Sequence, residues 1–405
     1  MSQHILVLGC GPAAAVTSLG LQHLGYRVTV LGLLRPYPVT EGISDRVYQA
    51  LASSGLHSAL ETVSPPVARS AIWNGTSRRA NTERLLFRPV FDAAVLDDLR
   101  NQGVRVEQVR VHSFAAADQR VVKTIAGGQL RNWQADFVVD ARGRAAGRHS
   151  AGLAKLERVR GPETVSLACC WDSDPNAAFS AVVSVEEGWL WLARTATGRL
   201  FTQFTTRASQ LDLATKSDIP ALIAARLESV TPGALPVANL VNASAPLARS
   251  STAILVDNPV QDGYIRIGDA AMAVDPLSGN GIFQSLSSAL VAPAVINTIL
   301  RRPEDAELAR QFYRRRLHHL FYRFARIGRD FYQSESRWES SSFWRDRRCW
   351  PDQLAVHPER DTVLGTAPRP VLNEGFIELK SVLLTADQPL GIWRVDGREV
   401  TRQQM

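Results

Sequence analysis

The sequence predicts an α/β protein with a Rossmann-like parallel sheet, an α+β part built on an antiparallel sheet, and a helical C-terminal region. Three observations support this prediction. Residues 4–31 follow the order apolar strand, glycine-rich turn, helix and second strand. Residues 180–206, "SAVVSVEEGWLWLARTATGRLFTQFTT", alternate apolar and polar side chains, as expected for three strands joined by Glu-Gly and Thr-Gly turns. Residues 301–347 have helical periodicity and are rich in arginine and aromatic residues.

The composition is that of a soluble globular protein with a basic surface. Of 405 residues, 45% are hydrophobic and 21% are charged. The net charge of +7 comes almost wholly from arginine, because the only lysines are Lys123, Lys155, Lys216 and Lys380. This charge reflects either a GC-rich genome or an acidic partner such as a protein. No basic block with interleaved aromatics resembles a nucleic-acid-binding module, so nucleic acid is not expected as a partner.

Three further features bear on the cellular location. The four cysteines form no metal or disulfide framework, so we expect no metal site and the reducing cytoplasm. The most apolar run, residues 281–300, is broken by Gln284, Pro293 and several serines and is not expected to span a membrane. The first strand begins at His4, with no basic region and cleavage site before it, so no secretory signal is expected.

The turn after the first strand carries Gly9, Gly11 and Ala14 in G-x-G-x-x-A spacing, with Pro12 and Ala13 between them. The first glycine permits a tight turn, the second lets the backbone approach a pyrophosphate, and the alanine lets helix and strand pack closely. The N-terminus of the following helix attracts phosphates. Within a strand–turn–helix–strand unit about 30 residues long, this spacing predicts a dinucleotide site.

The second strand ends at Gly32, where such units usually carry an acidic residue that binds a ribose. The missing acid counts against NAD more than against FAD, because FAD is anchored at many more points. We expect backbone groups near Gly32 and Leu33 to cover the adenosine half of the cofactor. Arg35 is expected to stack on the adenine or to pair with a phosphate, and FAD is expected to be held weakly.

The stretch "YIRIGDAAMAVDPLSGNGI", from Tyr264 to Ile282, resembles the G-D-A-A-x-x-x-D-P-x-x-G-x-G signature of FAD-dependent aromatic hydroxylases and flavin-dependent halogenases. The resemblance implies FAD and a cofactor fold of the glutathione-reductase and aromatic-hydroxylase type. It implies that Asp269 binds the ribityl chain and that the following loop lies against the isoalloxazine ring. The residues assigned to that loop contact are Pro276, Gly279, Asn280, Gly281 and Ile282.

Three further stretches resemble the same enzymes. "RPVFDAAVLDDL" resembles their R-x-x-F-D-x-x-L helix, which implies that Arg88 contacts the cofactor. Arg46, in "EGISDRV", falls where such hydroxylases carry an arginine near the flavin pyrophosphate. "ADFVVDARGR", residues 135–144, resembles a strand that ends in D-A-x-G beside the adenosine half.

These matches predict a discontinuous FAD-binding domain. It comprises residues 1–150 and 250–300, with an excursion at about 41–85. Residues 151–249 are expected to form an antiparallel-sheet substrate domain, and residues 301–405 a helical C-terminal region with a small tail.

Halogenation is disfavoured by two features. The resemblance implies that a halogenase would carry an early lysine, but no lysine precedes Lys123. Trp189 and Trp191 give W-x-W, yet Ala193 and Arg194 follow instead of the halogenase I-P. A hydroxylase needs less from the protein: reduced flavin and O2 form a C4a-hydroperoxide that an electron-rich ring attacks, while the protein excludes water and orients the substrate. The sequence identifies no catalytic base.

The pieces "EGISDRV", "DARGR", "EGWLWLA", "DPLSGNGI" and "RDFYQSESRWESSSFWRDR" together resemble flavoprotein monooxygenases that mature tryptophylquinone cofactors, of the type that serves quinohemoprotein amine dehydrogenase. This resemblance implies hydroxylation of a tryptophan in a partner polypeptide, which the basic surface would attract if that small subunit is acidic. The other reactants implied are O2 and either NAD(P)H or a flavin reductase. Two alternatives stay open: a hydroxylase or halogenase of a free aromatic metabolite, and a non-catalytic FAD-containing binding protein.

Overall fold

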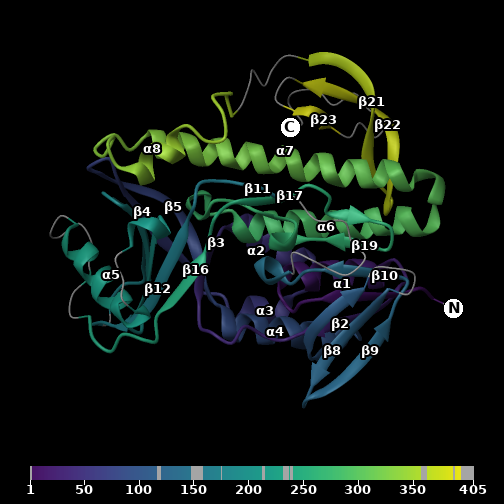
Figure 1. Ribbon diagram of the computed structural model, residues 1–405, viewed down its shortest axis with the longest axis horizontal. Helices are drawn as coiled ribbons and strands as arrows, with labels where there is room; N and C mark the ends of the chain where they lie inside the picture. Colours follow the sequence, from purple (N-terminus) through teal and green to yellow (C-terminus); the bar gives the residue numbers. More distant parts are fainter. Residues whose placement is uncertain are drawn as a thin grey trace.

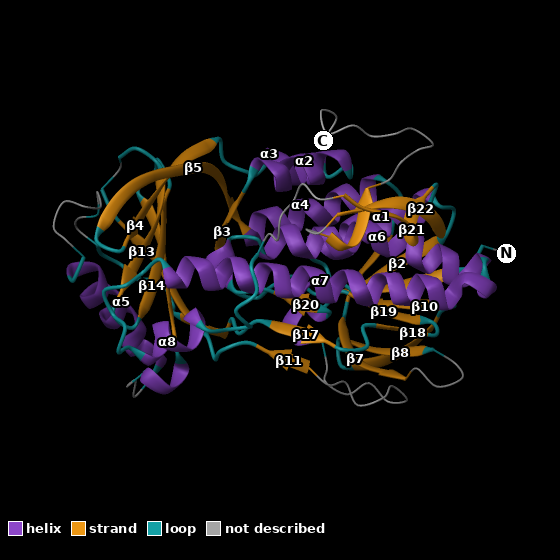
Figure 2. Ribbon diagram, turned by 90° about the horizontal axis from the view of Figure 1, so that it is seen from above, coloured by secondary structure: helices purple, strands orange, loops and turns teal. Residues whose placement is uncertain are grey.

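The computed structural model describes residues 2–115, 120–146, 158–174, 176–211, 215–230, 237, 240–356, 363–385 and 388–393. It shows the predicted α/β fold, with a parallel sheet near one end and an antiparallel sheet near the other. The long helix α7 (Ala306–Gln333) runs across both sheets, as Figures 1 and 2 show.

The parallel sheet has six strands and holds the glycine-rich turn at the end of its first strand. Successive residues of β1 face opposite sides, so Ile5 and Val7 pack with the helices while Leu6 and Leu8 pack with a small sheet on the other face. The strand order is β18 (Val260–Gln261), β19 (Tyr264–Arg266), β10 (Phe137–Asp140), β1 (His4–Leu8), β2 (Arg27–Gly32) and β6 (Arg105–Gln108). All neighbouring strands are parallel except the β18 and β19 pair.

Helices α1 (Pro12–His23), α4 (Arg88–Asn101) and α6 (Gly281–Arg301) pack together on one face of the parallel sheet. The small sheet on the other face consists of β7 (Arg110–Ala115), β8 (Val121–Ala126) and β9 (Gln129–Gln134). Both faces of β1 are therefore covered, which accounts for its continuous apolar sequence.

The antiparallel sheet has eight strands and includes two segments from far apart in the sequence. Its strand order is β16 (Leu247–Ser250), β12 (Val165–Asp172), β15 (Arg199–Thr206), β14 (Gly188–Arg194), β13 (Phe179–Val185), β4 (Pro66–Trp73), β5 (Thr76–Phe87) and β3 (Thr40–Ile43). Strands β13, β14 and β15 are the three expected between Ser180 and Thr206. β4 joins them through a parallel pairing with β13, and α5 (Ile219–Glu228) contacts β12 and β15.

The smaller elements connect these two sheets. Helices α2 (Asp45–Ser53) and α3 (His57–Glu61) follow β3, and α8 (Ser342–Arg348) follows α7. A three-stranded sheet of β11 (Arg158–Arg160), β17 (Ile254–Val256) and β20 (Met272–Ala273) lies beside α7, as Figure 2 shows.

The segment expected to be a small tail contains a sheet of its own. It consists of β21 (Val363–Asn373), β22 (Phe376–Thr385) and β23 (Gln388–Trp393) and packs against α6 and α7. Two hydrogen bonds of 2.8 Å attach it to α6, from the Ile377 backbone N–H to Thr298 Oγ1 and from Asn297 Nδ2 to the Gly375 carbonyl. This sheet therefore packs against the core.

Among the described residues, α6 is the one helix that is long and apolar enough to cross a membrane. The mean hydropathy of its most apolar 18 residues is 1.4. However, 67% of that stretch is buried inside the protein, against α1 and α7. We therefore interpret α6 as a core helix.

Asp140, at the end of β10, is completely buried and carries a pH-dependent part of the stability. Burial opposes its ionisation, but Arg142 donates to both carboxylate oxygens at 2.9 and 2.8 Å and holds the pKa of Asp140 below its usual value. Because the pKa is lower in the folded than in the unfolded state, this stabilisation is present at neutral pH and is lost as the pH falls below about 4.

We therefore expect the difference in unfolding free energy between wild type and Asp140→Asn to shrink as the pH is lowered from about 7 to about 3. Urea unfolding at several pH values measures this difference. Asp97→Asn, at an exposed position, is the control and should change stability little at any pH. A wild-type advantage over Asp140→Asn that stays constant down to about pH 3 would contradict the assignment.

Candidate functional site

The turn between β1 and α1 forms an open cradle for an anion. Gly9 has a φ of 118°, and a Cβ there would lie 2.5 Å from the carbonyl oxygen of Ala141. Gly11 is the N-cap of α1, and no side chain caps the helix, so its first N–H groups remain available. The nearest atom to a Cβ at Gly11 would be Nη2 of Arg88, 3.8 Å away. Backbone donors and a guanidinium thus converge where the sequence predicts a pyrophosphate.

A cleft of about 430 Å³ opens from this turn at the carboxyl ends of β1 and β2. The sheet continues through β2 on one side of β1 and through β10 on the other, so the cleft lies at the switch point where such sheets bind ligands. The predicted cofactor residues among its lining are Gly9, Gly11, Gly32, Leu33, Arg35 and Arg88.

Four charged side chains form a cluster at this cleft: Arg88 and Asp92 are buried, Glu41 is half-buried and Arg35 is exposed. Arg88, only 3% exposed, has Nη2 2.7 Å from Oδ1 of Asp92 and Nη1 3.5 Å from Oε1 of Glu41. Arg35 lies 3.3 Å from Glu41 and 3.8 Å from Asp92. Burial opposes the charged form of Arg88, but the two carboxylates outweigh it and raise its pKa. Burial raises the pKa of Asp92, with Arg88 opposing. The cluster therefore fixes α4 and β3 beside the glycine turn.

Gly32 has a packing role that the sequence did not reveal. A Cβ at this position would lie 2.7 Å from Sγ of Cys10 and 3.0 Å from Cα of Gly9. Any side chain here, including the acid of related units, would push against the glycine turn.

We expect Gly32→Ala to lower the unfolding free energy by about 1–3 kcal/mol, as overpacking usually does, and to weaken FAD binding. Urea unfolding and FAD titration measure both effects. Gly328→Ala is the matched control, since a Cβ there has no atom within 4 Å and α7 should gain up to about 1 kcal/mol. Equal unfolding free energies of the two variants would show that Cys10 and Gly9 leave room for a side chain at position 32.

Asp269 lies beside Gly143, which lines the cleft of about 430 Å³: a Cβ on Gly143 would be 3.9 Å from Cβ of Asp269. Its Oδ1 accepts a hydrogen bond of 3.0 Å from Ser285 Oγ, and its Oδ2 is 3.8 Å from Nε of Arg144. Its side chain is 37% exposed, and desolvation raises its pKa, with Arg144 opposing. The neighbouring Gly268 is so close to α1 that a Cβ would lie 3.2 Å from Cβ of Ala13. The second glycine-rich segment is thus packed directly on the first.

A series of side-chain hydrogen bonds holds the loop before α6 in place. Asp275 Oδ1 accepts from the Leu277 backbone N–H at 2.9 Å and from Tyr332 Oη at 3.0 Å. Tyr332 Oη in turn accepts from Trp189 Nε1 at 3.2 Å. Gly279 then turns the chain with a left-handed φ of 62°. Burial raises the pKa of Asp275, and its contacts give it a structural role in holding this loop.

A second cavity, of about 210 Å³, lies between this loop and the antiparallel sheet. The loop contributes Pro276, Gly279, Gly281 and Ile282, and β3 contributes residues 40–42. The sheet contributes Arg69, Glu83, Trp189, Trp191 and Gln203. Mostly apolar and aromatic walls with a few polar groups are typical of small-molecule and cofactor sites.

A smaller cavity of about 70 Å³ lies beside the second one and shares its lining residues Thr40, Trp191 and Gln203. It extends toward Cys169 of β12 and Leu247 of β16.

The remaining predicted residues lie as follows. Pro12, Ala13 and Ala14 are buried in the first turn of α1, and Asn280 precedes α6 as its N-cap. Arg46 is exposed on α2, with its guanidinium 5.6 Å from the ring centroid of Phe283, and it lines neither cleft. Its assignment to the pyrophosphate stays a prediction.

Sequence reasoning missed the polar lining of the second cavity, above all Arg69 and Glu83. The two-residue period of β5 places Glu83 on the same inward face as Leu85, and an inward-facing acid in an apolar strand could have marked the site. Trp189 and Trp191 share one face of β14 for the same reason.

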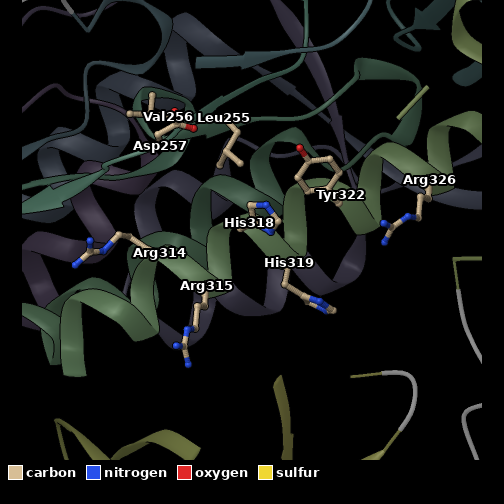
Figure 3. Close-up of a pocket in the computed structure, with 9 residues that line it drawn as sticks. All are labelled: Leu255, Val256, Asp257, Arg314, Arg315, His318, His319, Tyr322 and Arg326. Carbon is tan, nitrogen blue, oxygen red and sulfur yellow. The ribbon is translucent and has the colours of Figure 1, made fainter. Parts of the chain in front are cut away.

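A separate cleft of about 520 Å³ lies between α7 and β17 (Figure 3). Basic side chains from α7 dominate its lining: Arg314, Arg315, His318, His319 and Arg326. Figure 3 shows His318 on the side that faces β17. Arg314 and Arg326 already pair with Glu307 and Asp352, at 2.9 and 2.7 Å. This cleft shares no lining residue with the other cavities, so we assign it no part in cofactor binding.

The first two cavities suit a bound FAD. The uncapped start of α1 and the space at Gly11 suit its phosphates. In the second cavity, Thr40 Oγ1 and Arg69 Nε are buried and have no hydrogen-bond partner within the described part of the chain. Buried polar atoms without partners mark places where a bound group would supply them.

No protein-family model matches the sequence. Among solved structures, the chain is 46% identical to "Peptidyl tryptophan dihydroxylase QhpG essential for tryptophylquinone cofactor biogenesis", with a TM-score of 0.87 over 98% of this chain and 90% of that one. It also resembles CmlS, a flavin-dependent halogenase, with a TM-score of 0.76 over 96% of this chain and 86% of that one; at 17% identity that likeness shows the fold alone.

Two curated proteins are more distant relatives. The tryptophan 2-halogenase of Chondromyces crocatus is 23% identical over 387 residues, which cover 88% of this chain and 72% of the relative. The putative FAD-dependent oxidoreductase LodB of Marinomonas mediterranea is 23% identical over 376 residues, which cover 86% of this chain and 98% of the relative. The cofactor of this chain is FAD, and the protein is an oxidoreductase. With 46% identity over nearly its whole length to a flavoprotein of this kind, the chain belongs to the family of FAD-dependent monooxygenases and halogenases, on the branch that contains QhpG.

Proposed function

We propose that the protein is an FAD-dependent monooxygenase that hydroxylates a tryptophan side chain in a partner polypeptide during tryptophylquinone biogenesis. The observation that carries the proposal is the 46% identity to the peptidyl tryptophan dihydroxylase, across 98% of this chain. The aromatic cavity beside the loop that precedes α6 supports it, because an indole ring fits walls of this composition.

Reduced FAD supplies the activation of O2 when it is bound. We propose that its electrons come from NAD(P)H, directly or through a flavin reductase. The residues of this chain do the rest: the turn at Gly9 and Gly11 binds the phosphates, the loop from Pro276 to Ile282 orients the ring, and the two tryptophans of β14 help to exclude water.

The cation that lines the second cavity argues against halogenation. The residues that line this cavity include one arginine, Arg69, and no lysine. A guanidinium stays protonated at all relevant pH values and has no free electron pair to take up a halogen. The 23% identity to a tryptophan 2-halogenase nevertheless keeps an aromatic metabolite as the second candidate substrate.

The partner is proposed to be acidic and the reaction to take place in the cytoplasm. A net charge of +7 would attract an acidic polypeptide and would make association slower at high salt.

Co-expression with a small polypeptide, the tryptophan-bearing subunit of a quinohemoprotein amine dehydrogenase, tests the proposal. We expect a mass gain of about 16 or 32 Da on one tryptophan of that polypeptide, which needs FAD and a reductant. A gain only on free indoles or phenols would favour the metabolite hydroxylase, and a halogen on such a compound would favour the halogenase. Absence of any product with all reductants would leave a flavin-containing binding protein.

A further inference from the structure

We propose that Glu83 accepts the hydrogen bond of the target indole N–H in the second cavity, and that Arg69 neutralises the charge of this carboxylate. The inference rests on the proposed function, because it names the groups that hold the substrate ring in that reaction.

The backbone fixes the place of Glu83. Its side chain projects inward from β5, is only 8% exposed, and lines the cavity of about 210 Å³ that the flavin loop closes on the other side. The carboxylate packs directly on Gly42 of β3, since a Cβ on Gly42 would lie 2.6 Å from Cδ of Glu83. Burial of a carboxylate destabilises the folded protein unless hydrogen bonds and an opposite charge compensate it. The groups that this site binds are therefore those that donate hydrogen bonds to Glu83.

One oxygen of Glu83 already binds an indole. Trp191 Nε1 donates to Oε1 at 3.2 Å. Oε2 receives no hydrogen bond from the described residues, and it forms an ion pair with Nη1 of Arg69 at 3.9 Å. An ionised carboxylate accepts up to about four hydrogen bonds, so acceptor capacity remains at the cavity. The hydrogen bond from Trp191 shows that an indole N–H is a donor that this carboxylate can accept.

Arg69 places this acceptor opposite the flavin loop. Its guanidinium reaches from β4 across the cavity, with Nη1 3.7 Å from the position that a Cβ of Gly279 would take. Its Nε is buried without a hydrogen-bond partner among the described residues. An indole held by Glu83 would therefore lie between the sheet and the loop that orients the flavin ring.

The carboxylate would act on the charge that develops during hydroxylation. A ring carbon of the indole forms a bond to one oxygen atom of O2, and the O–O bond breaks. The other oxygen atom leaves as water, for which reduced FAD supplies the two electrons and reduced FAD and solvent supply the two protons. Positive charge then develops on the indole nitrogen until the ring carbon loses its proton to solvent. An anionic acceptor on the N–H stabilises this charge, an effect worth about 10²–10³-fold for one aligned group in other enzymes.

A pair of indoles tests the binding step on the FAD-loaded protein. We expect 3-methylindole to bind about 10-fold more tightly than 1,3-dimethylindole, which lacks the N–H, in calorimetric titration. Glu83→Leu should reduce this preference to about 2-fold or less, and Glu83→Gln should give an intermediate value. Glu186→Leu, at an exposed turn between β13 and β14, is the matched control and should keep the wild-type preference.

Turnover gives an independent readout. With the small polypeptide as substrate, Glu83→Gln should yield roughly 10²-fold less hydroxylated tryptophan per O2 consumed than the wild type. FAD affinity should be unchanged.

Equal affinities of the wild type for the two indoles, or no binding of either, overturn the inference. So does a wild-type product yield from Glu83→Gln, or an altered FAD affinity with an unchanged preference for the N–H. If the wild type prefers the N–H indole but adds no mass to the polypeptide, the assignment of Glu83 stands and the proposed polypeptide substrate is wrong.

Discussion

Arg88→Met should lower the unfolding free energy by about 3–5 kcal/mol and should leave the purified protein without FAD. The reason is the buried cluster beside the glycine turn. Removing this guanidinium leaves Asp92, only 4% exposed, without its closest cation, and it leaves Glu41 with Arg35 alone. Arg35 is 3.8 Å from Asp92 and replaces that pairing only in part. Urea unfolding of the apoprotein and the flavin absorbance of the purified protein measure the two effects.

Arg84→Met is the control for this prediction. Arg84 also pairs with an aspartate, at 2.9 Å, but its partner Asp45 is 63% exposed. Exposed ion pairs contribute at most about 1 kcal/mol, so the control should unfold almost as the wild type does and should retain FAD. If the two variants lost the same stability, the buried cluster would have no special role.

Asp269→Ala should raise the dissociation constant of FAD by about 10- to 100-fold, which corresponds to the loss of one or two hydrogen bonds to a charged group. The apoprotein should not lose stability. Desolvation raises the pKa of this carboxylate, which means that the empty fold disfavours its charge. Titration with FAD and urea unfolding of the apoprotein distinguish a cofactor ligand from a structural residue.

Asp257→Ala, an exposed position after β17, is the comparison for Asp269. It should leave the FAD affinity unchanged. A destabilised Asp269→Ala apoprotein with normal FAD affinity would assign Asp269 to the scaffold and would contradict the cofactor site.

The parts that could be predicted from the sequence are those with local signals. Gly9 and Gly11 act through the backbone of one turn, and Gly279 through a left-handed φ in one loop, so each leaves a short pattern. Gly32 shows the limit of this reasoning. Its lack of a carboxylate was visible in the sequence, but the contact with Cys10 that confines it became visible only in three dimensions.

The substrate side of the site depends on contacts between distant segments. Residues 68–72 of β4 pair with residues 179–183 of β13, more than a hundred positions later. This pairing brings Arg69 and Glu83 to the tryptophans of β14, and no short pattern encodes it. The sheet at residues 363–393 was missed because "PRPVLN" and its neighbours carry prolines that usually disfavour strands.

A single turnover with heavy-isotope O2 tests the central claim most directly. The purified protein, loaded with reduced FAD, is mixed with the small polypeptide in the presence of bromide, and the polypeptide is digested and weighed by mass spectrometry. The account predicts that one tryptophan gains oxygen that carries the heavy isotope and that no bromine is added. A tryptophan that stays unmodified while the reduced flavin is reoxidised, or one that gains bromine, would contradict it.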